Sequence, residues 1–249
     1  MLKIVVGQGD NKCEFGIHEA LLTARSKFFA KAMGKGRKEA KEKVVKLPDD
    51  EQEIFALYAS LVYTGTVPAF DERPGRIVHE NDAQTDCEYP EICQLEYESL
   101  VGLYVFAEKL QDVKAKNAAV DALIAKVTHE SKVIFNTECG GPCMPSYASI
   151  ETMYAKTPRH CPGRQVLIDC FVWYGQDEAM IHAGLLESAL PPRQFLIDLS
   201  SNLLSLRRQP RHKPPHEHIE SYQEPEDVEY EWDMTSWSCE VGIMSPVRR

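Results

Sequence analysis

The chain has 249 residues, a formal net charge of -10 at pH 7 and 43% hydrophobic residues. This length allows one domain with extensions or two small domains, and the apolar content suits a globular protein. The acidic balance argues against a protein that binds nucleic acid by neutralising phosphates. No stretch resembles a signal peptide or the roughly 20 apolar residues of a membrane span, so we expect a cytoplasmic or nuclear protein with reduced cysteines and no membrane partner.

The N-terminal part of the chain predicts a small sheet. Residues 2–6 are apolar and rich in β-branched side chains, and a glycine-containing turn separates them from the alternating pattern of 12–17. These two segments predict a hairpin. A lysine-rich stretch over 31–46, interpreted as a solvated turn, leads to a third predicted strand at 43–47.

Helical spacing begins after the hairpin. Apolar residues and one arginine recur three and four positions apart, predicting one helix or two short ones: Leu21, Leu22, Arg25, Phe28, Phe29, Ala32 and Met33. Ser26 is placed to cap the second helix. The pair Asp50 and Glu53 predicts a capping box for the next helix, with Gly65 as its end.

These spaced pieces together resemble the signature of a BTB/POZ domain, and most closely the fungal proteins that contain one. The signature residues are Phe15, Ile17, His18, Leu21, Leu22, Arg25, Ser26, Phe28 and Phe29, followed by 44–48, Phe55, the segment 61–65 with Tyr63 and Gly65, and 103–110. The resemblance covers the first half of the chain strongly and residues 164–205 more loosely. It implies an α+β BTB/POZ fold, a small β-sheet packed on a cluster of α-helices, over residues 1–130.

The rest of the chain divides by composition. We predict an acidic loop at 68–96, two helices over 100–127 packed as an antiparallel pair with Asp112 starting the second, and an irregular linker at 131–163. A helical extension at 164–206 and a disordered tail at 207–249 follow. Residues Pro191 and Pro192 are expected to open the last helix.

The resemblance implies a non-catalytic protein–protein interaction module that forms a homodimer or heterodimer, or recruits a protein partner. One version is a substrate adaptor for a cullin-type ubiquitin ligase, and the alternative is a dimerising scaffold or nuclear regulator without a ligase role. BTB domains that recruit a cullin often carry a hydrophobic-x-Glu motif before the third strand. The matching positions hold Arg37 and Glu39; the glutamate fits and the arginine does not. Phe55 and Tyr58 are further partner-binding candidates.

The resemblance also gives His18 a structural role. In BTB domains the matching histidine pairs with an acid at the start of the first strand, where this chain has Met1 and Leu2. We therefore expect His18 to lack that partner, and we expect the N-terminal segment that many BTB domains exchange across their dimer to be missing.

A different class of function is a zinc-binding protein that uses Cys139, Cys143, His160 and Cys161. The spacing of these residues is wider than the common Cys-x-x-Cys knuckle, and unligated thiols are the favoured interpretation. His212, His216 and His218 form a second, weaker group. The sequence has no Gly-x-Ser-x-Gly or similar nucleophile turn, so we predict no enzyme activity and no cofactor.

Overall fold

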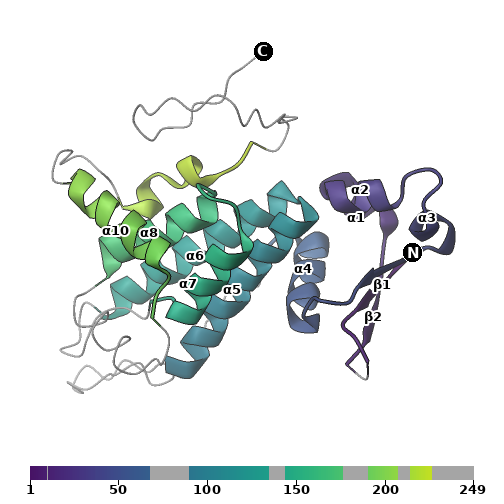
Figure 1. The fold of residues 1–249 in the computed structure, drawn as a ribbon, viewed down its shortest axis with the longest axis horizontal. Coiled ribbons are helices and arrows are strands. Elements are labelled where there is room, and N and C mark those ends of the chain that lie inside the picture. Colours follow the sequence, from purple (N-terminus) through teal and green to yellow (C-terminus); the bar gives the residue numbers. More distant parts are fainter. Residues whose placement is uncertain (10, 68–89, 135–143, 176–189, 207–213, 226–249) are drawn as a thin grey trace, which may run out of the picture.

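The structure is a computed structural model, and it describes residues 1–9, 11–67, 90–134, 144–175, 190–206 and 214–225, without the side chains of 90–94 and 129–134. Its class is α+β, as predicted: a mixed three-stranded sheet with helices. The sheet lies at one end of the elongated molecule and most of the helices lie at the other (Figure 1). Within the described residues, none of the helices is long and apolar enough to cross a membrane.

The sheet has the order β2-β1-β3, with bounds β1 Leu2–Val6, β2 Cys13–Ile17 and β3 Val44–Leu47. The predicted hairpin is confirmed, because β1 pairs antiparallel with β2, with Ile4 opposite Phe15. The chain reverses at Gly7, whose φ of +85° is a conformation that glycine adopts without strain. Strand β3 pairs parallel to β1, so β1 is the central strand and lies between two edge strands.

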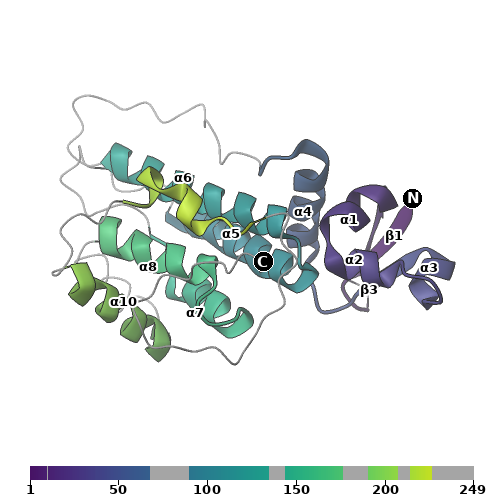
Figure 2. The same cartoon turned by 90° about the horizontal axis from the view of Figure 1, so that it is seen from above.

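Four helices lie on or beside the sheet: α1 Glu19–Arg25, α2 Lys27–Ala32, α3 Lys38–Glu42 and α4 Gln52–Thr64. The lysine-rich stretch is therefore not only a turn, because it contains α3. Helix α4 lies between the sheet and the larger helical cluster in both views (Figures 1 and 2). It ends at Gly65 in the left-handed conformation, as predicted.

The helical cluster contains α5 Pro90–Leu110, α6 Val113–Ile134, α7 Tyr147–Lys156, α8 Pro162–Tyr174 and α10 Arg193–Leu206, with two short 3-10 helices, η1 Pro215–Glu217 and η2 Ile219–Tyr222. Helices α5 and α6 lie side by side and only two residues join them, so they form the expected antiparallel pair (Figure 2). One apolar core runs from Leu2 in the sheet through Phe55 and Tyr104 to Phe171.

Four predictions about the elements are corrected. Helix α5 begins at Pro90, inside the predicted acidic loop 68–96, and α7 lies inside the predicted linker 131–163. Part of the predicted disordered tail, residues 214–225, is packed against the helices, and Tyr222 is buried. The capping box is absent: Glu51 caps α4 without a side-chain bond, while Asp50 accepts a bond of 2.6 Å from Lys109. Residues 68–89, 135–143, 207–213 and 226–249 lie outside the described residues.

Candidate interaction surface

The signature residues of α1 and α2 divide into a buried and an outward-facing set. Leu22 and Phe29 are fully buried. Phe28 is half-buried and packs edge-on against Phe29, with 5.2 Å between ring centroids, while Leu21 is exposed. The predicted apolar stripe thus forms core on one side and leaves apolar surface on the other.

Ser26 joins the two short helices to the end of α5. Its side-chain oxygen accepts a hydrogen bond of 3.2 Å from the backbone N–H of Phe29, which confirms the predicted cap of α2. The same hydroxyl donates to the backbone oxygen of Leu110 at 2.6 Å. Ser26 is buried, so both bonds lie away from solvent. A serine at the break between α1 and α2 therefore fixes this part of the chain to the helical cluster.

A buried carboxylate, that of Asp112, lies next to the contact between Ser26 and the end of α5. Asp112, fully buried, accepts hydrogen bonds from Arg25 Nε at 3.1 Å and from the hydroxyl of Tyr58 at 2.9 Å. Its second oxygen accepts the backbone N–H of Ala115 at 2.9 Å, which confirms Asp112 as the start of α6. Burial, and next the Asp112 carboxylate, raise the pKa of Tyr58 far above its usual value, so the phenol stays protonated and donates. This cluster connects α1, α4 and α6.

The partner of His18 is a tyrosine. His18 Nδ1 lies 2.9 Å from the hydroxyl of Tyr63, and the backbone N–H of His18 donates to the same oxygen at 3.2 Å. The rings meet edge to face, with 5.9 Å between centroids. Tyr63 is 50% exposed and His18 does not cap α1 with its side chain. His18, at the N-cap of α1, thus contacts α4 through Tyr63, and the structural role implied by the resemblance stays a prediction.

Arg37 and Glu39 lie on the surface at α3, directly before the edge strand β3. Arg37 is exposed at the N-cap position and Glu39 is partly buried in the first turn. The Lys and Arg side chains of residues 31–46 are all exposed, on a chain whose net charge is -10. We call these side chains the basic surface: Lys31, Lys35, Arg37, Lys38, Lys41, Lys43 and Lys46. Lys38 pairs with Glu42 at 3.7 Å and Lys43 pairs with Glu19 at 2.8 Å.

Phe55 and Tyr58 do not contribute to this surface. Both side chains are fully buried. The ring of Phe55 lies 4.7 Å from that of Phe15 on β2 and 5.9 Å from that of Phe106 on α5, and Tyr58 binds Asp112. These two partner-binding candidates are therefore corrected to core residues, because their face of α4 is covered on one side by the sheet and on the other by α5.

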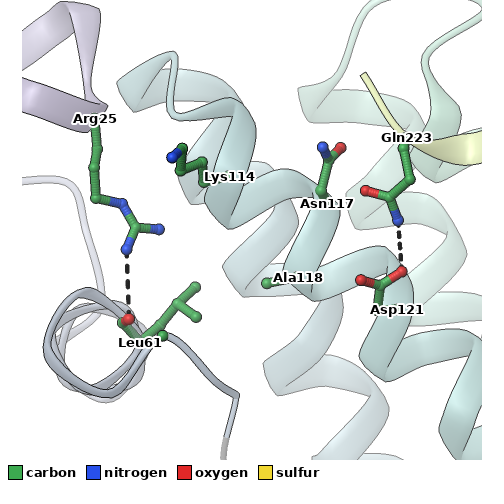
Figure 3. Close-up of a pocket in the computed structure, with 8 residues that line it drawn as sticks. Arg25, Leu61, Lys114, Asn117, Ala118, Asp121 and Gln223 are labelled. Carbon is green, nitrogen blue, oxygen red and sulfur yellow. Dashed lines mark hydrogen bonds between the residues drawn. The ribbon is translucent and has the colours of Figure 1, made fainter. Parts of the chain in front are cut away.

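A cleft of about 320 Å³ opens between α1, α4 and α6. Figure 3 shows Arg25 reaching the backbone oxygen of Leu61, and Gln223 donating to Asp121. Asn117 exchanges two hydrogen bonds with the backbone of Glu224, at 3.0 and 2.9 Å. Burial raises the pKa of Asp121, and the bond from Gln223 opposes that rise. These polar groups bind one another, so we interpret the cleft as a seam between elements.

Sequence reasoning missed the segment 214–225, which we call the strap. The hydroxyl of Tyr222 donates to the buried carboxylate of Asp169 on α8 at 2.7 Å, and His218 Nε2 lies 3.1 Å from the same hydroxyl. His216 Nδ1 lies 2.6 Å from the hydroxyl of Tyr174. Of the histidines predicted as weak metal ligands, His216 thus holds the strap to α8 and His218 contacts Tyr222 within the strap, while His212 lies outside the described residues. An aspartate within the apolar run 166–173 was the available signal, because a buried charge needs a partner.

The strap also contacts α6 through charges. Lys116 is nearly buried and its ammonium group contacts Glu224 on the strap and Glu108 on α5. Burial lowers the pKa of Lys116, but the two carboxylates outweigh burial and the net shift is upward. The ammonium form is therefore favoured in the folded chain, and it joins α5, α6 and the strap.

The four zinc candidates are not all described. Cys139 and Cys143 lie outside the described residues. Cys161 is buried at the start of α8, where its thiol lies 3.4 Å from the hydroxyl of Thr157, and the preceding His160 has a φ of +61°. Among the side chains that the structure describes, no group of three or more histidines, cysteines and carboxylates has a geometry that suits a metal ion.

Comparison with protein-family models and with curated proteins finds no match to this chain. The resemblance to BTB/POZ domains therefore stays a prediction that depends on the signature residues and their order. What the structure adds is their placement: Leu22, Ser26 and Phe29 hold α1 and α2 against the core, and the segment with Arg37 and Glu39 is on the surface.

Proposed function

We propose that this chain is a non-catalytic protein-interaction module of the BTB/POZ type, which recruits a protein partner or dimerises. The observation that carries the proposal is the division of the signature. Leu22, Phe29 and Ser26 pack inside, whereas the residues at the cullin-motif positions lie at the surface beside an edge strand: Arg37 is exposed at the N-cap of α3 and Glu39 is partly buried in its first turn. Side chains that are exposed at signature positions are the ones that can reach a partner.

The basic surface favours a partner with acidic groups, because its seven Lys and Arg side chains are exposed within residues 31–46 of a chain of net charge -10, and only Lys38 and Lys43 among them pair with a carboxylate within the described residues. Arg37 replaces the apolar anchor of the cullin motif, and a guanidinium fills an apolar pocket at a cost in desolvation. The scaffold version, without a ligase role, is therefore favoured over the cullin adaptor. Glu39 matches the glutamate of the cullin motif, so the adaptor version is tested as well.

The experiment is light scattering on a sizing column with the full chain, alone and mixed with the N-terminal region of the BTB-binding cullin. The adaptor version predicts a complex that Glu39→Lys weakens and that Arg37→Leu strengthens, because leucine restores the apolar anchor. The matched control is Glu42→Lys, which makes the same charge change on the same helix but outside the motif. A complex that responds equally to Glu39→Lys and Glu42→Lys would argue for general charge attraction instead.

Absence of a complex with the cullin, together with a stable dimer of the chain alone, would support the scaffold version. A monomer in both runs would count against both versions.

A further inference from the structure

Helix α10 lies on the outside of the helical cluster, at the end of the molecule farthest from the sheet (Figures 1 and 2). One face of it is buried. Phe195 is fully covered, and its ring lies 5.8 Å from that of Tyr154 on α7 and 5.3 Å from that of Phe171 on α8. Leu199, one turn further along, is 5% exposed. This face accounts for the packing of α10 on its own chain.

A second apolar face of α10 points away from the core. Its residues are Leu196 at 40% exposure, Ile197 at 44%, Leu203 at 46% and Leu204 at 59%, with the exposed Ser200 between them. At 3.6 residues per turn these five positions fall within an arc of about 120°, so they form one continuous stripe. We call it the α10 stripe. None of the described segments covers it.

The α10 stripe is symmetric about Ser200. Its apolar members stand three and four residues before the serine and three and four residues after it, so the pattern is the same in both chain directions. Positions i±3 and i±4 around a small central residue are the ones that meet when two helices cross, and a small residue at the crossing lets the backbones approach closely.

We propose that α10 is a homodimer interface, in which two copies of the helix pack antiparallel with a two-fold axis at Ser200. Leu196 of one copy then faces Leu204 of the other, Ile197 faces Leu203, and the two Ser200 side chains meet at the axis. A two-fold contact requires a surface that is complementary to itself. A stripe that is unchanged by reversal meets this requirement, and that is the reason for assigning a second copy as its occupant.

Charge does not oppose this pairing. Helix α10 contains two charged residues, Arg193 and Asp198. Asp198 is partly buried and accepts bonds from Tyr154 at 3.1 Å and from Gln194 at 2.8 Å. Arg193 is exposed in the first turn, seven residues from Ser200, which places it at the rim of the contact. About half of each apolar side chain is already covered within the chain, so the contact is small and its dissociation constant is expected in the micromolar range.

The test is sedimentation of the full chain at concentrations from about 1 to 200 µM, which bracket the expected dissociation constant. Ser200→Glu places two like charges against each other at the axis and is expected to weaken the dimer more than about tenfold. Ser200 is exposed, so its replacement leaves the folded monomer intact. The matched control is Ser205→Glu, an exposed serine on the same helix outside the stripe, which leaves the dimer unchanged.

A mixing experiment tests the position of the axis. Ser200→Glu and Ser200→Lys are each expected to be monomeric alone, and to form a heterodimer when mixed, because the two-fold axis brings residue 200 of one copy onto residue 200 of the other. Failure of the mixture to associate would overturn the two-fold pairing.

Two other results would also overturn the proposal. A wild-type chain that is monomeric at every concentration would leave another segment of the chain or a different protein as the occupant of the stripe. A dimer that survives Ser200→Glu would place the interface elsewhere. The inference does not depend on the proposed function, because the basic surface lies at the opposite end of the molecule (Figure 1). A monomeric Ser200→Glu chain therefore keeps whatever partner binds α3, so partner recruitment at α3 and the α10 interface fail separately, whereas a monomeric wild-type chain counts against both the α10 interface and the dimerising version of the proposed function.

Discussion

Replacing Asp112 by asparagine removes the charge at the joint between α1, α4 and α6 while keeping the size of the side chain. The carboxylate accepts three hydrogen bonds, from Arg25, Tyr58 and the backbone of Ala115. An amide accepts through one oxygen only, so its NH2 group faces at least one donor. Hydrogen bonds to a charged group contribute about 1.5 to 3 kcal/mol each, and breaking a buried ion pair costs about 3 to 5 kcal/mol.

Arg25 keeps 15% of its side chain in solvent, so water partly compensates its lost partner and the lower end of the range applies. We expect Asp112→Asn to lower the free energy of unfolding by about 3 kcal/mol, measured by urea denaturation followed by circular dichroism. The control is Tyr58→Phe, which removes one of the three bonds to the carboxylate and is expected to cost about 1.5 kcal/mol. A loss below about 1 kcal/mol for Asp112→Asn would refute the view that this carboxylate holds the elements together.

Three further predictions concern other parts of the core. Gly163→Ala is expected to lower the free energy of unfolding by about 2 kcal/mol in the same assay, because the added Cβ would lie 2.6 Å from the Tyr104 ring; a more stable variant would contradict this. Tyr222→Phe removes the bond to Asp169, so it is expected to cost about 1 to 2 kcal/mol and to increase proteolysis within the strap; unchanged cleavage would show that the strap does not depend on this bond. Burial is the main cause of the raised pKa values of Tyr58, Tyr104 and Tyr222, so these phenols lose their protons in the unfolded chain first, near pH 10. The free energy of unfolding is therefore expected to stay constant below that pH and to fall above it, measured by urea titrations from pH 7 to about 11. A flat profile would contradict this.

Local patterns predicted the N-terminal half well. The three strands, the Ser26 cap, the Gly65 stop and the Asp112 start each depend on residues close in sequence, and the structure confirms all of them. The capping box failed because Asp50 has a competing partner in Lys109, 59 residues away. A pattern of four residues contains no information about such a distant cation.

The residues of the candidate interaction surface were harder to predict, because they depend on which side chains the rest of the chain buries. Phe55 is one of the residues that carry the predicted resemblance and Tyr58 follows it three residues later, and a sequence pattern does not distinguish a side chain that meets a partner from one that meets the core. The strap was missed for a related reason. Its composition of Pro, His and Glu is that of a solvated tail, and its order depends on Asp169 and Lys116, which lie in distant helices.

The long sequence separations of these contacts bear on how the chain folds as it is synthesised. Ser26 binds Leu110 across 84 residues, and Arg25 binds Asp112 across 87. The N-terminal hairpin is therefore synthesised long before α5, the helix that Ser26 and α2 contact. The apolar face of the hairpin stays exposed to solvent during that time. A further 107 residues must be synthesised after Asn117 before its partner Glu224 is present. The chain is therefore exposed to aggregation until Glu224 has been synthesised, so its yield in the cell is expected to depend on chaperones that hold nascent chains.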